Sequence, residues 1–415
     1  MDTLVIEGGN LLSGEVIIGG AKNSAVALIP ASILSDEKVV LSNIPNISDC
    51  DALIEILEYL GVRVNKKGTK MEINNSLIQN RNIPENIAKK LRASYYFMGA
   101  LLGKYKEVEM YFPGGCSIGS RPINLHLKGF EALGAKIKEK DNKYIIKANK
   151  LIGNDIYLDV ASVGATINIM LAAVKAEGVT TIRNAAREPE IVNVAIFLNN
   201  MGAKIIGAGT NEIKILGVDK LEGCSHEVIP DRIEAGTYMI IASLIGKKVK
   251  IKNIIPEHLE TLIFKLKEMG IKMEEGLNYV TISKPKTLQS INIKTLTYPG
   301  FPTDLQQPIT TLLTQCKGSS FLEETIYEDR FKNVEYLNKM GANIIIRGNI
   351  IEIKGPSKLK AKEVYATDLR AGASLILAAL IADGITKIRN INHILRGYED
   401  IVKKLTSLGA KVKIE

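Results

Sequence analysis

Hydrophobic and polar positions follow one pattern along the chain, and that pattern recurs six times. Each copy contains an amphipathic segment with helical spacing, such as residues 52–60 or 398–405, with a Leu-Gly or Met-Gly pair at or just after its C-terminal end. The separations between these glycines are 73, 68, 68, 71 and 68 residues, and the glycines are Gly61, Gly134, Gly202, Gly270, Gly341 and Gly409. So constant a period predicts a structural repeat in which each glycine ends its helix.

The rest of each copy predicts strands and a second helix. After the fifth glycine, residues 343–354 carry two strand-forming runs around the turn dipeptide Gly348-Asn349. An earlier helix, such as residues 163–174 or 369–380, is apolar on all sides and is therefore expected to be buried, with a short strand after it. We expect an α/β fold of six β-α-β-α-β-β repeats in two lobes of three, with buried helices inside, sheets outside and a cleft between the lobes.

Polar residues recur at the N-terminal end of the buried helix, 37 to 42 residues before the glycine of each copy. Free N–H groups and the positive dipole end of a helix favour anions, so several such ends at one cleft would form an anion site. The alternative is that Asp and Ser at these places only cap their helices. The residues at or beside these ends are Lys22, Asn23, Ser24, Arg92, Ser162, Val163, Gly164, Asp231, Arg232, Asp304, Asp368, Leu369 and Arg370.

Candidate chemistry also lies outside these helix ends. Arg330 and Arg396 suit bidentate capture of a carboxylate or phosphate, although either could equally pair with a surface carboxylate. Cys116 lies in a loop with glycines at positions 114, 115 and 119, and Arg121 follows five residues later. Glycine lets the backbone approach a ligand and a nearby cation favours the thiolate, which indicates a reactive cysteine; the alternative is an incidental cysteine in a surface turn.

Charge and composition narrow the function classes. The 415-residue chain has 54 Lys and Arg against 45 Asp and Glu, so its formal net charge is 54 − 45 = +9, which suits an acidic ligand. Nucleic acid is not favoured, because the lysines are spread out and aromatic residues make up 5%, with no Trp. Four scattered cysteines without a CxxC pair indicate neither a disulfide framework nor a zinc site. Since the N-terminus lacks a signal-peptide pattern and the apolar runs are too short to span a bilayer, we expect a cytoplasmic protein with no membrane contact.

Seven segments carry motifs, and in order they are residues 20–24 (GAKNS), 113–122 (PGGCSIGSRP), 162–166 (SVGAT), 186–190 (AREPE), 230–237 (PDRIEAGT), 367–370 (TDLR) and 396–398 (RGY). Together they resemble the UDP-N-acetylglucosamine 1-carboxyvinyltransferase family, the enolpyruvyl transferases that begin bacterial peptidoglycan synthesis. The resemblance covers essentially the whole chain. The loop around Cys116 and the Lys22-Asn23 pair separate this family from the related 5-enolpyruvylshikimate-3-phosphate synthases.

The resemblance implies a domain organisation. Members of the family have two domains of three repeats each, in an arrangement called an inside-out α/β barrel, with the active site in the cleft between them. The first residues of the chain are expected to cross over to the second domain, so we place the domains at 22–229 and at 1–21 with 230–415. A monomer without cofactor or metal is expected.

The resemblance also implies a reaction. The enolpyruvyl group of phosphoenolpyruvate would pass to the 3-hydroxyl of UDP-N-acetylglucosamine by addition and elimination, with release of phosphate. An acid must protonate the alkene carbon, a base must take the hydroxyl proton, and cations must hold the phosphate. Cys116 is expected to be the acid, to form a covalent phospholactoyl adduct, and to lie on a loop that closes as a lid. Asp304 is expected to be the base.

Substrate-binding roles follow from the same resemblance. Lys22, Arg121 and Arg396 are expected to hold the phosphate of phosphoenolpyruvate, and Arg330 and Arg370 its carboxylate. Asn23 is expected near the sugar and Arg92 near the cations of the cleft. The residues expected along the nucleotide or completing its pocket are Arg121, Pro122, Ile123, Asn124, Leu125, Ser162, Val163, Gly164, Ile326 and Asp368.

Two positions depart from the family pattern, because Asn124 stands where many members have Asp and Ala161 where some have Lys. Altered nucleotide affinity is the expected consequence. Cys116 is retained, which implies inactivation by fosfomycin. Two other functions stay open. One is transfer to shikimate 3-phosphate, against which the lack of a Pro-Gly-Ser-Lys-Ser opening argues. The other is non-catalytic binding of a nucleotide or nucleic acid, which the net charge of +9 motivates.

Overall fold

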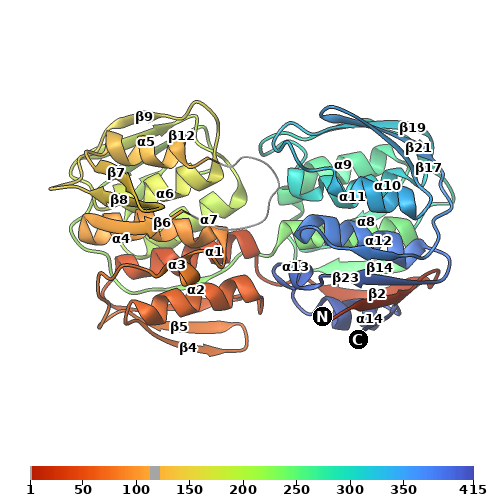
Figure 1. The fold of residues 1–415 in the computed structure, drawn as a ribbon, viewed down its shortest axis with the longest axis horizontal. Coiled ribbons are helices and arrows are strands. Elements are labelled where there is room, and N and C mark those ends of the chain that lie inside the picture. Colours follow the sequence, from red (N-terminus) through yellow and green to blue (C-terminus); the bar gives the residue numbers. More distant parts are fainter. Residues whose placement is uncertain (1, 113–121) are drawn as a thin grey trace. The chain divides into compact units, whose positions relative to one another are not determined.

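The computed structural model describes residues 2–112 and 122–415. These residues fall into two compact units, each formed mainly by one half of the chain (Figure 1). We call residues 20–112 with 122–229 the N-terminal unit, and residues 2–19 with 230–415 the C-terminal unit. Each unit has its own hydrophobic core, as the packing of buried residues shows.

Three buried helices form the centre of the N-terminal unit. They pack on one another, and they are α1 (Lys22–Ala31), α4 (Tyr96–Tyr105) and α6 (Val163–Ala173). Nearly every residue of each helix is buried, as expected for helices that are apolar on all sides. Three amphipathic helices complete the repeats, namely α2 (Ser48–Tyr59), α5 (Asn124–Ala132) and α7 (Pro189–Asn200). The short helices are η1 (Ser32–Leu34), α3 (Glu85–Ala88) and η2 (Arg92–Tyr95).

Three sheets belong to the N-terminal unit, and their strands alternate between buried and exposed residues. The first has the order β13 (Ser225–Glu227), β3 (Lys38–Ser42), β5 (Lys70–Asn74) and β4 (Arg63–Lys67). The second has the order β6 (Glu107–Tyr111), β8 (Lys143–Lys147) and β7 (Lys136–Lys140). The third has the order β11 (Lys204–Ile206), β12 (Glu212–Leu216), β10 (Val179–Arg183) and β9 (Asp155–Tyr157).

The second repeat departs from the expected β-α-β-α-β-β order. Within the described residues its sheet has three strands, and the helical turn α3 precedes its buried helix where other repeats have a first strand. Pro84 is the N-cap of that turn. Proline has no N–H to give to a strand ladder, and it suits the start of a helix. The prediction of a complete unit was therefore wrong at this place.

The C-terminal unit repeats the plan around the buried helices α8 (Arg232–Ile245), α10 (Gln306–Leu313) and α12 (Leu369–Ile381), which also pack on one another. Its amphipathic helices are α9 (Glu260–Glu268), α11 (Lys332–Lys339) and α14 (Ile401–Ser407). Three short helices complete the set: η3 (Pro256–Leu259), η4 (Thr303–Leu305) and α13 (Asn392–Leu395).

In two of the C-terminal unit's sheets, the strand that follows a buried helix pairs with the later strand of the next hairpin. One has the order β15 (Met273–Glu275), β16 (Tyr279–Ile282), β14 (Gly246–Lys252) and β2 (Leu12–Ile17). The other has the order β17 (Leu288–Gln289), β19 (Cys316–Glu323), β21 (Ile350–Gly355) and β20 (Asn343–Arg347), with β18 (Ile293–Lys294) beside β19. The third sheet has the order β22 (Glu363–Tyr365), β23 (Ile385–Arg389), β1 (Leu4–Glu7) and β24 (Lys411–Ile414).

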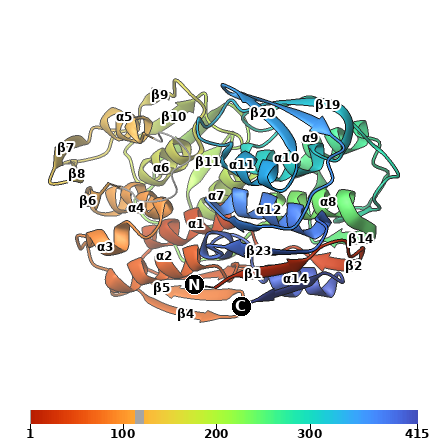
Figure 2. The same cartoon turned by 45° about the vertical axis from the view of Figure 1, so that its right-hand side comes forward.

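The first strands of the chain complete sheets of the C-terminal unit. Strand β1 pairs antiparallel with both β23 and β24, and β2 pairs parallel with β14 (Figure 2). In return, β13 from the end of the N-terminal unit pairs parallel with β3 near its start. Each unit therefore joins segments that are distant in sequence.

The six repeat glycines take the conformation that the pattern predicted. Their φ angles are +89°, +94°, +98°, +89°, +108° and +99°, and each lies two residues after the last residue of an amphipathic helix. A positive φ lets the last carbonyls of a helix find partners, and glycine adopts it without the strain that a Cβ introduces. The period in the sequence thus marks real helix ends.

Candidate active site

Several candidate residues lie at or beside the N-terminal ends of the buried helices. Lys22 is the first residue of α1, Arg92 begins η2 just before α4, and Val163 begins α6. In the C-terminal unit Arg232 begins α8, and η4 with Asp304 leads into α10. Asp368 is the N-cap of α12, where its Oδ1 accepts from the N–H groups of Arg370 and Ala371 at 2.9 and 3.0 Å.

Asp304 binds two arginines, one through each carboxylate oxygen. Arg330 Nη2 donates to Oδ1 at 2.6 Å, and Arg370 Nη2 donates to Oδ2 at 2.9 Å. The arginine side chains are 3% and 6% exposed, while that of Asp304 is 26% exposed, so the carboxylate is the accessible member. Burial alone would raise the pKa of Asp304, but the charges of Arg370 and Arg330 outweigh it and hold that pKa well below its usual range.

A second set of contacts orients the two arginines. Arg370 Nη1 donates to the hydroxyl of Tyr398 at 3.3 Å, and that hydroxyl pairs with Thr237 Oγ1 at 3.0 Å. The amide of Gln307 donates to the carbonyl oxygen of Arg330 at 2.8 Å. Tyr398, Thr237 and Gln307 are buried, so their side chains have little freedom. Sequence analysis assigned no role to these three residues; Thr237 and Tyr398 were only members of the motifs at residues 230–237 and 396–398.

Ile326 and Arg396 lie in loops of the same unit. The N–H of Ile326 donates to Glu324 Oε1 at 2.8 Å, and the same carboxylate accepts from Thr295 Oγ1 and Thr303 Oγ1 at 2.9 Å each. Since Thr303 belongs to η4, Glu324 links the loop of Ile326 to the turn that carries Asp304. Arg396 directly follows α13.

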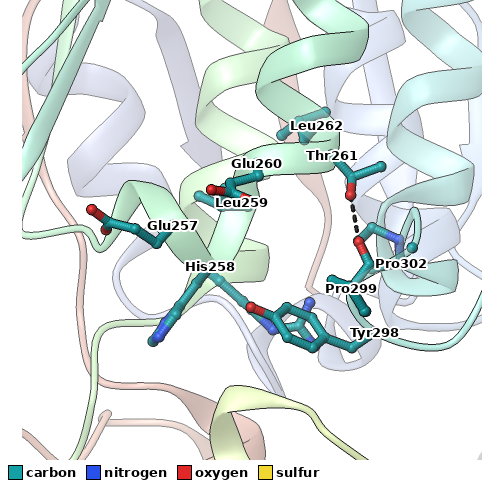
Figure 3. A pocket seen from close by; sticks show the side chains of 11 residues that line it. Glu257, His258, Leu259, Glu260, Thr261, Leu262, Tyr298, Pro299 and Pro302 are labelled. Carbon is teal, nitrogen blue, oxygen red and sulfur yellow. Dashed lines mark hydrogen bonds between the residues drawn. The ribbon is translucent and has the colours of Figure 1, made fainter. Parts of the chain in front are cut away.

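A pocket in the C-terminal unit adjoins the Asp304 turn (Figure 3). Its lining comprises Arg232, residues 257–262, residues 298–300 and Pro302. Arg232 lies over the Tyr298 ring, 5.5 Å from its centroid, and the hydroxyl of Thr261 donates to the carbonyl oxygen of Pro299. Burial raises the pKa of Asp304, and the charge of Arg232 helps Arg370 and Arg330 to lower it, with a smaller effect than theirs. Sequence analysis identified Arg232 as a candidate from its place at a helix start, but only the structure shows its effect on the pKa of Asp304.

In the N-terminal unit, Lys22 is held by a carboxylate. Its Nζ lies 2.8 Å from Oδ2 of Asp49, which belongs to the first turn of α2. The two side chains are 15% and 5% exposed, so the pair is largely shielded from water. Asn23 is the next residue of α1 and is half-buried. The sequence analysis missed Asp49, whose only signal was an acidic residue in a first helical turn.

The predicted nucleotide-binding segments lie at the starts of two helices. Pro122 and Ile123 precede α5, and Asn124 and Leu125 are its first residues. Ser162 is the N-cap of α6, and its Oγ accepts from the N–H of Ala165 at 3.3 Å. Val163 and Gly164 form the first turn of α6, and Ala161 comes just before its cap. Cys116 and Arg121 lie outside the described residues.

Two kinds of feature are absent from the part of the chain that the structure describes, namely a metal-binding cluster and a membrane-spanning helix. Residues 2–112 and 122–415 contain no group of three or more His, Cys, Asp or Glu side chains placed to hold a metal ion. Over the same residues, no helix is both long enough and apolar enough to cross a membrane.

Comparison with known proteins identifies the class. A sequence profile described as EPSP synthase (3-phosphoshikimate 1-carboxyvinyltransferase) matches residues 6–405. The enolpyruvyl transferase NikO of Streptomyces tendae has the same fold, with a TM-score of 0.91 at 25% identity over 100% of this chain and 98% of that one. The structure of EPSP synthase from Acinetobacter baumannii matches with a TM-score of 0.75 at 19% identity, over 100% of both chains. The fold is that of the enolpyruvyl transferases.

Curated sequences give a narrower match. UDP-N-acetylglucosamine 1-carboxyvinyltransferase 2 of Oceanobacillus iheyensis is 54% identical over 412 residues, which are 99% of this chain and 96% of the relative. The protein of the same name from Listeria monocytogenes is 52% identical over 99% of this chain and 97% of its own length. The one from Clostridium acetobutylicum is also 52% identical, over 100% of both chains. The chain therefore belongs to the UDP-N-acetylglucosamine 1-carboxyvinyltransferases within the EPSP synthase family.

Proposed function

We propose that this protein transfers the enolpyruvyl group of phosphoenolpyruvate to the 3-hydroxyl of UDP-N-acetylglucosamine and releases phosphate. One observation carries the proposal: a carboxylate held between two buried arginines, in a chain that matches 1-carboxyvinyltransferases from end to end. The reaction would be the first committed step of peptidoglycan synthesis. A cytoplasmic location and roles in cell division and cell shape are proposed with it.

The chemistry proceeds in two steps whose atoms balance. The sugar oxygen bonds to C2 of phosphoenolpyruvate while an acid gives a proton to C3 and a base takes the hydroxyl proton. The resulting tetrahedral intermediate then loses a proton from its methyl carbon and expels phosphate, which restores the alkene. We assign the acid to Cys116, which can also form the covalent phospholactoyl adduct, and the base to Asp304.

The two arginines on Asp304 explain how its basicity can be controlled. Because Arg330 and Arg370 hold its pKa low, the carboxylate is ionised before substrate binds. We assign the same arginines to the carboxylate of phosphoenolpyruvate. When the substrate takes one of them, Asp304 loses a cation, its pKa rises, and it becomes a better base next to the sugar hydroxyl. The two arginines therefore keep Asp304 ionised but weakly basic before substrate binds, and substrate binding increases its basicity.

The remaining roles complete the proposed site. Lys22, Arg121 and Arg396 hold the phosphate that is released, Asn23 contacts the sugar, and Arg92 adds positive charge. The nucleotide lies along Pro122, Ile123, Asn124 and Leu125, with its diphosphate at Ser162, Val163 and Gly164, and with Ile326 and Asp368 at the edge of its pocket. We propose that residues 22–229 and 1–21 with 230–415 are the two domains and that the active site draws residues from both.

A phosphate-release assay tests the function. Purified protein with phosphoenolpyruvate and UDP-N-acetylglucosamine is expected to release phosphate, whereas shikimate 3-phosphate in place of the sugar nucleotide is expected to give none. Release only with shikimate 3-phosphate, or with neither acceptor, would overturn the proposal. The 51–54% identity to proteins named for the sugar nucleotide, against 19–20% for the EPSP synthase structures, favours the first acceptor.

Cys116 has its own test. Fosfomycin is expected to inactivate the protein and to add its mass to one thiol, as intact mass spectrometry can show. The Cys116→Asp variant is expected to keep turnover and lose the adduct, because a carboxyl can donate a proton but does not react with the drug in this way.

Light scattering is expected to show a monomer.

A further inference from the structure

The first turn of α6 faces two polar side chains from other helices. A Cβ placed on Gly164 would lie 2.8 Å from the hydroxyl oxygen of Tyr95 and 3.0 Å from Nε2 of His126. Both distances are shorter than ordinary contacts, so glycine is what lets these groups approach the turn. Tyr95 comes from η2 and His126 from α5, and their rings lie edge to face with centroids 4.9 Å apart.

Both side chains are at least nine-tenths buried, with His126 5% exposed and Tyr95 9% exposed. In the part of the chain that the structure describes, no donor or acceptor bonds to Nε2 of His126 or to the hydroxyl of Tyr95. Each of these two side chains is largely enclosed in protein and has a polar atom that no described residue bonds, which points to a ligand at this helix end. The helix end itself adds the N–H groups of Val163 and Gly164, which have no acceptor within α6.

The contacts of Asn168 determine where the proton of His126 lies. The backbone N–H of Gly99 can only donate, and it lies 2.9 Å from Oδ1 of Asn168. The amide nitrogen of Asn168 must therefore face the other way, where it lies 2.8 Å from Nδ1 of His126. Since that nitrogen also donates, Nδ1 must be an acceptor and the ring proton must be on Nε2. His126 thus presents an N–H group to the first turn of α6.

The ring stays neutral at physiological pH. Burial, and then the charge of Arg92, lower the pKa of His126 to about 3. Asn168, Tyr95 and Gly164, which also surround the ring, carry no charge there. A neutral Nε2–H group donates a hydrogen bond without changing its protonation state.

We propose that His126 Nε2–H and the Tyr95 hydroxyl form, with the first turn of α6, an anion subsite that binds a phosphate oxygen of the nucleoside diphosphate. This inference rests on the proposed function, which places the diphosphate at Ser162, Val163 and Gly164. Backbone N–H groups and neutral side-chain donors suit a phosphate diester, whose oxygens accept but do not donate. Asn168 acts as a positioning residue, because it sets the tautomer of His126.

Calorimetry with UDP-N-acetylglucosamine, UDP and uridine tests the subsite. The His126→Phe variant is expected to bind the two diphosphates about tenfold to a hundredfold more weakly, the effect of losing a hydrogen bond to a charged group, and to bind uridine unchanged. Tyr95→Phe is expected to lose about threefold to tenfold in the same pattern. His126→Gln, which keeps an N–H group near the position of Nε2, is expected to recover part of the loss. His226→Gln, a histidine on β13 that contacts α7, is the matched control and is expected to bind normally.

The Asn168→Asp variant tests the tautomer. One carboxylate oxygen still accepts from Gly99, but the other now faces Nδ1 and draws the proton to that nitrogen. Nε2 then presents a lone pair to the phosphate unless the ring is protonated. We therefore expect binding of UDP-N-acetylglucosamine to strengthen from about pH 8 to about pH 6 in this variant, whereas the wild type stays constant.

The outcomes separate this inference from the proposed function. If the wild type turns over and the His126→Phe and Tyr95→Phe variants bind the diphosphates within twofold of it, the subsite is wrong. Equal losses for uridine and the diphosphates would also overturn it. If the wild type binds UDP with the expected variant losses but releases no phosphate, the function fails and the subsite stands. A wild type that binds neither diphosphate refutes both. Nitrogen NMR of the folded wild type checks the tautomer without any variant, and a proton on Nδ1 would contradict the assignment.

Discussion

Arg370 Nη2 lies 2.9 Å from Oδ2 of Asp304, and the guanidinium reaches this carboxylate from the first turn of a buried helix. The backbone N–H of the same arginine bonds to the N-cap Asp368. The cap at the start of α12 thus also helps to position Arg370. Its buried guanidinium lies beside the partly exposed carboxylate of Asp304. This relationship determines the charge state of the proposed base.

Replacing Asp304 tests its role as the base. Asp304→Asn keeps the size of the side chain but removes its proton acceptor, so kcat is expected to fall by about 10²- to 10⁴-fold. The binding of UDP-N-acetylglucosamine is expected to change much less, as calorimetry can measure. Asp159→Asn, an exposed carboxylate paired with Lys128, is the control and is expected to leave kcat unchanged. A kcat within tenfold of the wild type for Asp304→Asn would exclude it as the base.

Tyr398 is expected to position Arg370. Tyr398→Phe removes the hydroxyl that accepts from Arg370 Nη1 but keeps the buried ring. The KM for phosphoenolpyruvate is expected to rise about fivefold to tenfold, the effect of one lost hydrogen bond, while kcat at saturation changes less. Tyr279→Phe, on strand β16, loses a hydroxyl bonded to Glu274 and should behave as the wild type. A change in kcat alone would argue for a direct catalytic role instead.

The Lys22–Asp49 pair is expected to contribute to stability as well as to binding. Asp49→Asn removes the carboxylate that lies 2.8 Å from the shielded ammonium of Lys22, and losing one charge of a largely buried pair is expected to cost about 3 kcal/mol of unfolding free energy. Asp51→Asn, two residues further along α2, breaks an exposed pair with Lys66 and is expected to cost less than about 0.5 kcal/mol. Urea titration of both variants measures the difference. Equal small costs would show that Lys22 finds sufficient compensation elsewhere.

The lowered pKa of the buried His126 side chain predicts that the stability of the protein depends on pH. Its pKa is about 3 in the folded protein, below its unfolded value of 6.5, so the unfolded chain binds the proton more readily. The contribution of the neutral ring is fully present above pH 6.5 and is lost as the pH falls from 6.5 toward 3. At pH 5 the loss is about 2 kcal/mol. His126→Gln removes this titration, so its melting temperature should fall less than that of the wild type between pH 7 and pH 5. Parallel curves would contradict a buried neutral histidine.

Much of the fold follows from residue types at regular spacing. A helix end depends on the residues within one turn of it, so Gly61 and its five counterparts could be recognised without any tertiary contact. The same holds for the N-cap Asp368 and for the start of α6 at Val163. The incomplete second repeat was not foreseen, because a first strand there would depend on pairing across a sheet.

Pairs of residues far apart along the chain could not be found in this way. Sequence analysis named Asp304, Arg330 and Arg370 but assigned the arginines to the substrate, whereas in the structure both bind Asp304 from 26 and 66 residues away. His126 drew no attention, although Asn168 sets its tautomer from 42 residues away and Gly99 in turn orients Asn168 from 69 residues away.

Helix starts and ends, and the polar residues at helix N-termini, depend on neighbours within a few residues, so they could be recognised in the sequence. Which charges meet, how Asp304 is held ionised and which nitrogen of His126 carries the proton depend instead on how the helices pack. Hydrogen bonds and ion pairs act over about 3 Å, and spacing along the chain does not bring their partners that close.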